Sequence, residues 1–315
     1  MSTPMNRLYV QTLDQPLPPQ DTRDKGVFAR KIERLHALLS GADAVVIGVG
    51  SGMSTASGYD FYHESELFDE AFGAFSKAHG FTTLFDGMYH LFPDNEQQWA
   101  FNAAVADFVD ALPLGEPYRR LAKIVEGMEH FVLTTNVDGQ VPRAFDEGRY
   151  WLFQGDLRFM QCSQPCDDAV VHDRALMQRL LSEAMSGAEG IPRVSSDSLP
   201  RCPHCHRLMA PWVRDTAFLE GSLWRAQKSA YEAFLTRHLM EGEGNVLFLE
   251  LGVSSMTPSI IKMPFWDMVA RNPRTSYVEV NCAEETTPLQ LGDRAMVITA
   301  DIARVVEELE PKGTG

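Results

Sequence analysis

The sequence predicts an α/β fold, a doubly wound parallel sheet that is interrupted twice along the chain. Three observations support this prediction. Apolar, β-branched runs typical of buried strands alternate with segments of helical periodicity, as in a parallel sheet flanked by helices. An aromatic segment with a helical pattern follows the first strand, and two cysteine pairs interrupt the alternation further on. We therefore expect a sheet domain with a helical insertion and a cysteine module.

The composition is that of a globular protein with an acidic surface. Of 315 residues, 44% are hydrophobic and 23% are charged, and this length predicts roughly two domains. Lys and Arg total 28 against 43 Asp and Glu, so the formal charge of −15 argues against nucleic-acid binding. The polar start, Met1 to Gly26, has no apolar signal region, and no run is long enough to span a bilayer. We expect a cytoplasmic protein with an N-terminal arm.

A glycine-rich turn follows the first predicted strand, Ala44 to Ile47, whose apolar residues suit a strand buried on both faces. Gly48, Gly50 and Gly52 let the backbone turn sharply and approach a ligand, and Met53 to Ser57 can open a helix whose free N–H groups face it. The dinucleotide fingerprint G-x-G-x-x-G does not fit, because no glycine stands at its third position. The turn predicts a phosphate site, with a tight turn that binds no ligand as the alternative.

Helical patterns surround this strand. Val27 to Leu39 has apolar residues at helical spacing and leads into the strand. Ser65 to Phe108 is rich in aromatic residues, most of which we expect in the core of a small helical insertion, with some lining a substrate groove. Tyr118 to Glu126 predicts another helix.

The second parallel strand, His130 to Thr134, ends in polar residues. Thr135, Asn136 and Asp138 follow it directly, with Gly139 next. The carboxyl ends of parallel strands are where such sheets hold ligands and catalytic groups. A turn is the alternative, because Asn, Asp and Gly are common turn formers.

Four of the five cysteines form two close pairs. Cys162 and Cys166 are separated by three residues, and Cys202 and Cys205 by two. Four thiolates in two hairpins can close a tetrahedral shell around zinc, and a closed shell is structural because it leaves no position for substrate. In a chain without a secretory signal, this spacing favours metal over disulfides. We expect the two histidines beside the second pair to lie on the surface and Cys282 to lie outside the shell.

The remaining elements continue the alternation. A short strand at 150–153 precedes Gln154 and the first cysteine pair, and the chain returns to the sheet after the second pair. The expected elements are a helix near 222–240, a strand at 245–251, a helix from 258, a strand at 276–280, a strand at 295–299 and a helix from 301.

The motifs at the strand ends resemble those of the sirtuin (Sir2) family. Gly50 to Phe61 resembles Gly-Ala-Gly-x-Ser-x-x-Ser-Gly-Ile-Pro-Asp-Phe-Arg, with one residue missing before Asp60 and with Tyr62 or His63 in place of Arg. The polar segment that follows the second strand resembles Thr-Gln-Asn-Ile-Asp-Gly-Leu, with Thr135 in place of Gln.

Later motifs keep the family's order. Gly252 to Ser255 resembles the Gly-Thr-Ser loop, and Val280-Asn281 resembles the Ile-Asn pair that grips the adenosine ribose. Ala210 to Val213 resembles the start of Arg-Pro-x-Val-Val. The resemblance covers most of the chain from about Ala42 onward.

The resemblance implies a Rossmann-like NAD domain and a smaller domain made of the zinc module and the helical insertion, with NAD in the cleft between them. The NAD domain would comprise 27–62, 106–158 and 213–315, and the smaller domain 63–105 and 159–212. NAD and zinc are the implied cofactors. The residues implied for NAD are Gly50, Ser51, Gly52, Ser54, Asp60, Phe61, Thr135, Gly252, Ser254, Ser255 and Asn281.

One departure from the family changes the expected chemistry. Sirtuins place a catalytic His where this chain has Gln154. Imidazole can take a proton from a ribose hydroxyl near neutral pH, whereas an amide cannot, so deacylation should fail while cleavage of NAD survives. The pattern resembles the class M sirtuins, the branch linked to macrodomains. That likeness implies Asn136, Asp138 and Gln154 as the active centre.

The class M likeness also implies partners. Its members transfer ADP-ribose to a lipoyl-carrier protein related to glycine cleavage H, so we expect a protein acceptor of this kind and a macrodomain hydrolase. Two other functions stay open. One is a lysine deacylase in which Asp138 or His63 supplies the base, and the other is a module that binds NAD or ADP-ribose without turnover.

Overall fold

The larger half of the molecule is built around a six-stranded sheet. The computed structural model describes residues 21–185, 190–254, 258–282 and 287–310. The strand order is β3-β2-β1-β7-β8-β9, and every neighbouring pair is parallel. This confirms the predicted parallel sheet. Its strands are β1 (Ala44–Val49), β2 (His130–Thr134), β3 (Tyr150–Leu152), β7 (Val246–Leu251), β8 (Thr275–Asn281) and β9 (Ala295–Thr299).

The direction in which strands are added reverses between β1 and β7. Counted along the chain, the six strands of this sheet stand in the order 3-2-1-4-5-6, which is the Rossmann arrangement. At such a reversal the connections after the two strands leave toward opposite faces and open a crevice at the carboxyl edge. The glycine turn after β1 and the loop after β7 contact each other at this reversal.

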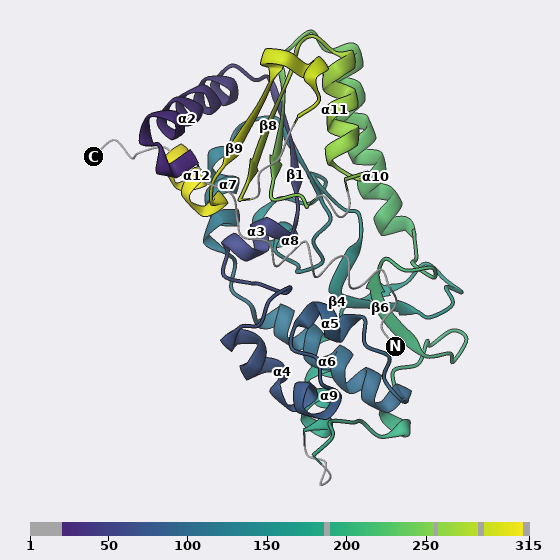
Figure 1. The fold of residues 1–315 in the computed structure, drawn as a ribbon. Coiled ribbons are helices and arrows are strands. Elements are labelled where there is room, and N and C mark those ends of the chain that lie inside the picture. Colours follow the sequence, from purple (N-terminus) through teal and green to yellow (C-terminus); the bar gives the residue numbers. More distant parts are fainter. Residues whose placement is uncertain (1–20, 186–189, 255–257, 283–286, 311–315) are drawn as a thin grey trace.

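Helices cover both faces of the sheet, and all six residues of β1 are buried, as the sequence predicted. Three helices pack together on one side, and α10 and α11 lie on the other (Figure 1). The first group is α2 (Lys25–Ser40), α7 (Glu116–Ile124) and α12 (Ile302–Leu309), and the second is α10 (Ser222–Leu235), continued by η3 (Thr236–Glu241), and α11 (Lys262–Arg271). Shorter helical pieces are η1 (Asp21–Arg23), α3 (Ser51–Ala56), α8 (Val141–Ala144), η2 (Ser196–Ser198) and η4 (Leu289–Arg294).

The smaller half of the molecule combines helices with a second sheet (Figure 1). This sheet is antiparallel, in the order β5-β4-β6. The elements are α4 (Glu66–His79), α5 (Leu84–Met88), α6 (Asn95–Ala111), α9 (Arg174–Ala184), β4 (Gly155–Cys162), β5 (Val170–Val171) and β6 (Met209–Val213). Most of the aromatic side chains predicted to form a core do so, among them Phe68, Phe72, Phe75, Phe81, Trp99 and Phe101.

The small antiparallel sheet was not predicted, for a physical reason. Its strand β6 contains Pro211, which normally argues against a strand, but β6 is an edge strand that pairs with β4 alone among the described strands, and proline is tolerated on an edge. In β4, Gln161 interrupts the apolar pattern, yet it is buried because its side chain bonds to the backbone of Ala217 and Leu219. The folded structure therefore satisfies polar groups that look unsuited to a buried strand.

Two elements run through the positions where the sequence suggested domain boundaries. Helix α6 continues across 105–106, and β4 continues across 158–159. At the N-terminal side, α2 begins at Lys25, one residue before the end of the expected arm, because the Asp24 side chain caps it by accepting from the N–H groups of Gly26 and Val27. None of the helices in the described ranges has the length and apolar character needed to cross a membrane.

Candidate active site

The glycine turn packs against the loop that follows β7. Gly50 precedes α3, and the Gly52 N–H donates to the carbonyl of Gly252 at 2.9 Å. A Cβ atom on Gly50 would lie 2.5 Å from Gly252 O, and one on Gly52 would lie 2.7 Å from Gly252 Cα. The two glycines are thus required by contact between the two loops, a reason that the sequence did not reveal. Among the described residues, no side chain caps the start of α3.

Four buried polar side chains converge beside this turn. The Asn136 Nδ2 atom lies 2.9 Å from Gly50 O and 3.0 Å from the Tyr118 hydroxyl. It also lies 3.1 Å from Ser54 Oγ. Ser54 Oγ donates to Asp138 Oδ2 at 2.5 Å, and the Tyr118 hydroxyl lies 3.4 Å from the same oxygen. The structure therefore brings Ser54, Asn136 and Asp138 together and adds Tyr118.

Burial shifts the pKa values of two members of this cluster, Asp138 and Tyr118. Burial raises the pKa of Asp138, while hydrogen bonds from the Ser54 hydroxyl and the Gln140 N–H oppose the rise. Burial also raises the pKa of Tyr118 well above its usual value, and the charge of Asp138 adds to the effect. Tyr118 accordingly keeps its proton at neutral pH and acts as a hydrogen-bond donor.

Gln154 lies at the same edge of the sheet, in the turn between β3 and β4. The Phe153 N–H donates to Thr134 O at 3.1 Å, which places the turn beside the end of β2. The Arg214 N–H donates to Gln154 O at 3.0 Å. Within the ranges that the structure describes, no hydrogen bond involves the Gln154 side chain, which is only partly buried. The turn is held by its backbone, and the carboxamide is available to a ligand.

Arg214 fixes this turn with its side chain as well. Its Nε and Nη2 atoms donate to Phe153 O at 3.2 and 3.1 Å, and the Trp224 indole N–H donates to the same oxygen at 3.1 Å. The guanidinium carbon lies 4.7, 4.4 and 5.2 Å from the ring centres of Phe153, Phe218 and Trp224. Glu220 pairs with its outer side at 2.9 Å. This arrangement of rings and hydrogen bonds leaves the Phe153 carbonyl little freedom.

A buried ion pair connects the Gln154 turn to the Asp138 segment. Arg158 Nη2 lies 2.6 Å from Asp156 Oδ2, and Asp156 is fully buried. Gly139 has a φ of 66°, and a Cβ there would collide with the Arg158 side chain. The Leu157 N–H donates to Val137 O at 2.9 Å. These contacts dock the start of β4 on the segment that carries Asn136 and Asp138.

Asp60 is occupied within its own turn. Its Oδ1 atom accepts from the N–H groups of Tyr62 and His63 at 2.9 and 3.1 Å, and Oδ2 lies 2.8 Å from His63 Nδ1. Phe61 makes an edge contact with Phe108, with ring centres 6.5 Å apart. The assignment of Asp60 and Phe61 to NAD stays a prediction.

The loop after β7 lies on the opposite side of β1 from the segment after β2. The Gly252 N–H donates to Val280 O at 2.9 Å, and Asn281 Nδ2 donates to Val253 O at 3.2 Å. Ser254 is partly buried, and Ser255 lies outside the described residues. Thr135 on the β2 side donates its N–H to Val49 O at 3.1 Å. Their assignment to NAD likewise stays a prediction.

The four paired cysteines form one cluster. The Sγ atoms of Cys162, Cys166, Cys202 and Cys205 all lie within 4.8 Å of one another, and the closest pairs are 3.5 Å apart. Sulfur atoms on a tetrahedral zinc with bonds of about 2.3 Å stand about 3.8 Å apart, so the cluster fits the ion. A hydrogen bond from the Arg207 N–H, with smaller contributions from the other thiols, lowers the pKa of Cys205 to about 6. The arrangement matches the predicted structural zinc site.

Two curated proteins that resemble the chain in sequence have ADP-ribosyltransferase in their names. No family model matches the chain. A protein ADP-ribosyltransferase of Staphylococcus aureus is 28% identical over 282 residues, which cover 88% of this chain and 86% of that protein. A probable bifunctional ADP-ribose hydrolase/ADP-ribosyltransferase of Fusarium oxysporum f. sp. cubense is 27% identical over 277 residues, which cover 85% of this chain and 46% of that protein.

Solved structures of Sir2 proteins superpose on most of the chain. A Sir2 homologue in complex with ADP-ribose superposes with a TM-score of 0.55 at 18% identity, covering 88% of this chain and 94% of its own. Sir2 bound to an acetylated peptide gives a TM-score of 0.52 at 20% identity, covering 88% and 96%. The chain has the sirtuin fold. Arg214 takes the place of the last valine of the sirtuin motif Arg-Pro-x-Val-Val, so two departures from the motifs, Gln154 and Arg214, touch each other.

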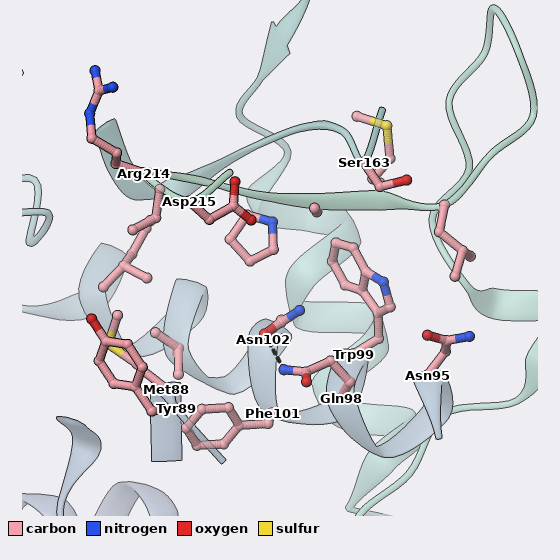
Figure 2. A pocket seen from close by; sticks show the side chains of 17 residues that line it. Met88, Tyr89, Asn95, Gln98, Trp99, Phe101, Asn102, Ser163, Arg214 and Asp215 are labelled. Atoms are coloured by element: carbon pink, nitrogen blue, oxygen red, sulfur yellow. Dashed lines mark hydrogen bonds between the residues drawn. The ribbon is translucent and has the colours of Figure 1, made fainter. Parts of the chain in front are cut away.

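The sirtuin-fold chain also carries a pocket of about 530 Å³ between α6 and the β4–β6 sheet. Figure 2 shows Arg214 toward one end and Ser163 toward the other, with carboxamide side chains of α6 between them. Gln98 donates to Asn102 at 3.1 Å across this face. Because the Arg214 backbone bonds to Gln154, the pocket begins next to the Gln154 turn.

Sequence analysis missed two residues that shape the site. Tyr118 stood at an apolar position of a predicted helix, and no local pattern separates a tyrosine that packs from one whose hydroxyl enters a polar cluster. Arg214 offered a signal, because a charged residue replaces an apolar one in a recognised motif. Its aromatic partners Phe218 and Trp224 follow within a few residues, but only the fold shows that they surround it.

Proposed function

We propose that this chain is an NAD-dependent protein mono-ADP-ribosyltransferase of the sirtuin type. The observation that carries the proposal is Gln154, which stands at the place of the sirtuin imidazole with its carboxamide unbonded in the described structure. The buried cluster of Ser54, Tyr118, Asn136 and Asp138 contains no histidine either. The relatives whose names include ADP-ribosyltransferase activity support the same reading.

The crevice suits a dinucleotide. No side chain in the described part of the chain caps the start of α3, so its N–H groups are suited to a pyrophosphate, next to Ser51 and Ser54. In the proposed binding mode, one ribose lies toward Asn136 and the other toward Ser254 and Asn281. The glycine turn after β1 and the loop after β7 contact each other through Gly50, Gly52 and Gly252.

The residues present support cleavage and transfer but not deacylation. Bound NAD would supply an electrophilic C1′ atom as its bond to nicotinamide breaks and nicotinamide leaves with the electron pair. The Asn136 amide nitrogen is surrounded by three acceptors, so its amide oxygen is the atom left to orient a ribose hydroxyl. The Gln154 carboxamide can hold the same ribose through hydrogen bonds without taking a proton. The acceptor then forms the new bond to C1′, and any proton it carries passes to solvent.

The acceptor is proposed from the resemblance, with support from the pocket. We infer a lipoyl-carrier protein related to glycine cleavage H, which would approach along the pocket that begins beside Gln154. The fungal relative is named as both a hydrolase and a transferase, which favours a macrodomain hydrolase as a second partner of this chain.

Mass spectrometry tests the proposal directly. The enzyme is incubated with NAD and a lipoylated carrier, and also with NAD and an acetyl-lysine peptide. We expect an ADP-ribose adduct on the carrier, released nicotinamide and no O-acetyl-ADP-ribose. Formation of O-acetyl-ADP-ribose without any adduct would support the deacylase instead. Binding of NAD without release of nicotinamide in any mixture would support the non-catalytic module.

A further inference from the structure

A buried charged network lies behind the loop that follows β7. Glu250 on β7 and Glu279 on β8 are direct neighbours in the sheet, and both are fully buried. Lys262 Nζ lies 2.7 Å from Glu250 Oε1 and 2.5 Å from Glu279 Oε1. The Tyr277 hydroxyl lies 2.7 Å from Glu250 Oε2 and 3.2 Å from Glu279 Oε2. None of these four residues belongs to the polar cluster around Asn136.

The network connects both ends of one loop to the same strand. Glu250 stands two residues before Gly252, and Lys262 is the first residue of α11, so the pair brackets the loop that carries Ser254. Glu279 stands two residues before Asn281 on β8, and alternate residues of a strand share a face. Asn281 in turn donates to Val253 O at 3.2 Å. Strand β8 therefore connects the network to the backbone at Val253.

Burial makes this arrangement demanding. Two carboxylates on adjacent strands repel each other in a low-dielectric interior, and the Lys262 ammonium group between them offsets part of that repulsion. The start of α11 must then stay against the sheet. The start of α11 does lie close to the sheet: a Cβ atom on Gly48 of β1 would lie 2.3 Å from the Cγ2 atom of Ile261, the residue before α11.

We propose that Glu250, Lys262, Glu279 and Tyr277 are positioning residues that hold Gly252, Val253, Ser254 and Asn281 in the arrangement that binds the adenosine ribose. This inference rests on the proposed placement of NAD. The four side chains act through Ser254 and Asn281, and they have no role at the carbon where nicotinamide leaves. Their loss should weaken NAD and ADP-ribose by the same factor, because both ligands contain the adenosine half.

Calorimetry on the full chain with NAD and with ADP-ribose tests the inference. We expect Glu279→Gln to raise both dissociation constants about tenfold, because Ser254 and Asn281 would then be held less firmly and would orient the ribose poorly. Tyr277→Phe, which removes a single hydroxyl and keeps every charge, should raise both about threefold. Tyr277→Phe keeps the test decisive if Glu279→Gln does not fold. The control is Thr275→Val, which removes a buried hydroxyl bonded to Asn272 O at 2.6 Å at the other end of β8.

The outcomes separate the two proposals. Wild-type affinity in both network variants, or an equal loss in Thr275→Val, would overturn the positioning role and leave the proposed function intact. A loss for NAD alone would also overturn it, because it would place the effect at the nicotinamide end. Failure of the wild-type chain to bind either ligand would overturn the proposed function together with this inference.

Discussion

The two sides of the candidate site are held in different ways. On the sheet side, Ser54, Tyr118 and Asn136 bond to one another through buried side chains. On the other side, Gln154 is held through its backbone carbonyl, which accepts from Arg214, while rings and carbonyl contacts fix Arg214 itself. On the sheet side the polar side chains hydrogen-bond to one another, whereas on the Gln154 side the carboxamide is available to a ligand.

This difference follows from the supporting structure. The sheet side grows from β1 and β2, whose backbone groups are paired within the parallel sheet. The Gln154 side opens β4, which belongs to the small antiparallel sheet and ends at Cys162 of the cysteine cluster. Damage to the metal site should therefore reach Gln154 before it reaches Asn136.

The largest effect should come from breaking the cysteine cluster. Cys202→Ala removes one ligand, and a structural zinc contributes on the order of 10 kcal/mol to folding, so metal should be lost and the smaller half should unfold. Elemental analysis and calorimetric melting check this, with Cys282→Ala, outside the cluster, as the matched control that keeps its metal. Well-folded wild-type protein without metal would refute the assignment.

The next largest effect should fall on the sheet side. Asn136→Ala removes the amide that joins Gly50, Ser54 and Tyr118, and we expect transfer to fall about 100-fold or more through lost orientation. Single-turnover release of nicotinamide measures it. Asn245→Ala, the same change at the opposite edge of the sheet, should stay near the wild-type rate. Equal rates in both variants would remove Asn136 from the active centre.

The fold was predictable to the extent that it depends on local patterns. The buried strands were recognisable because they are continuous apolar runs, and β2 and β9 have the predicted bounds. The small sheet was not recognisable, because Pro211 and Gln161 are compatible with strands only in their tertiary setting. In the candidate site, the position of Asn136 and Asp138 after a strand could be predicted from sequence, whereas Tyr118 reaches them from a helix.

A smaller effect should come from the Gln154 side. Arg214→Lys keeps the charge but loses the two-nitrogen grip on Phe153 O, so we expect the rate constant for transfer to fall about tenfold while NAD affinity changes little. Arg225→Lys is the matched control, because Arg225 also bonds to the Glu220 region but is exposed. A loss of NAD affinity with an unchanged rate would show that Arg214 serves binding rather than orientation.

The smallest effect is a pH dependence of folding stability that comes from Asp138. It should be present on the sheet side and absent on the Gln154 side. Burial, the dominant cause, raises the pKa of Asp138 above its ordinary value of 3.8, so the folded protein binds this proton more tightly than the unfolded chain does. Folding stability from this group is therefore greatest below pH 3.8 and declines as pH rises through the folded-state pKa. Asp138→Asn does not titrate, so the melting temperature of the wild type minus that of the variant should decrease as pH increases across this window. Gln154→Glu should show no such trend, because its side chain is only partly buried and makes no hydrogen bond within the described ranges. A difference between wild type and Asp138→Asn that grows with pH would mean that hydrogen bonds, rather than burial, govern this carboxylate.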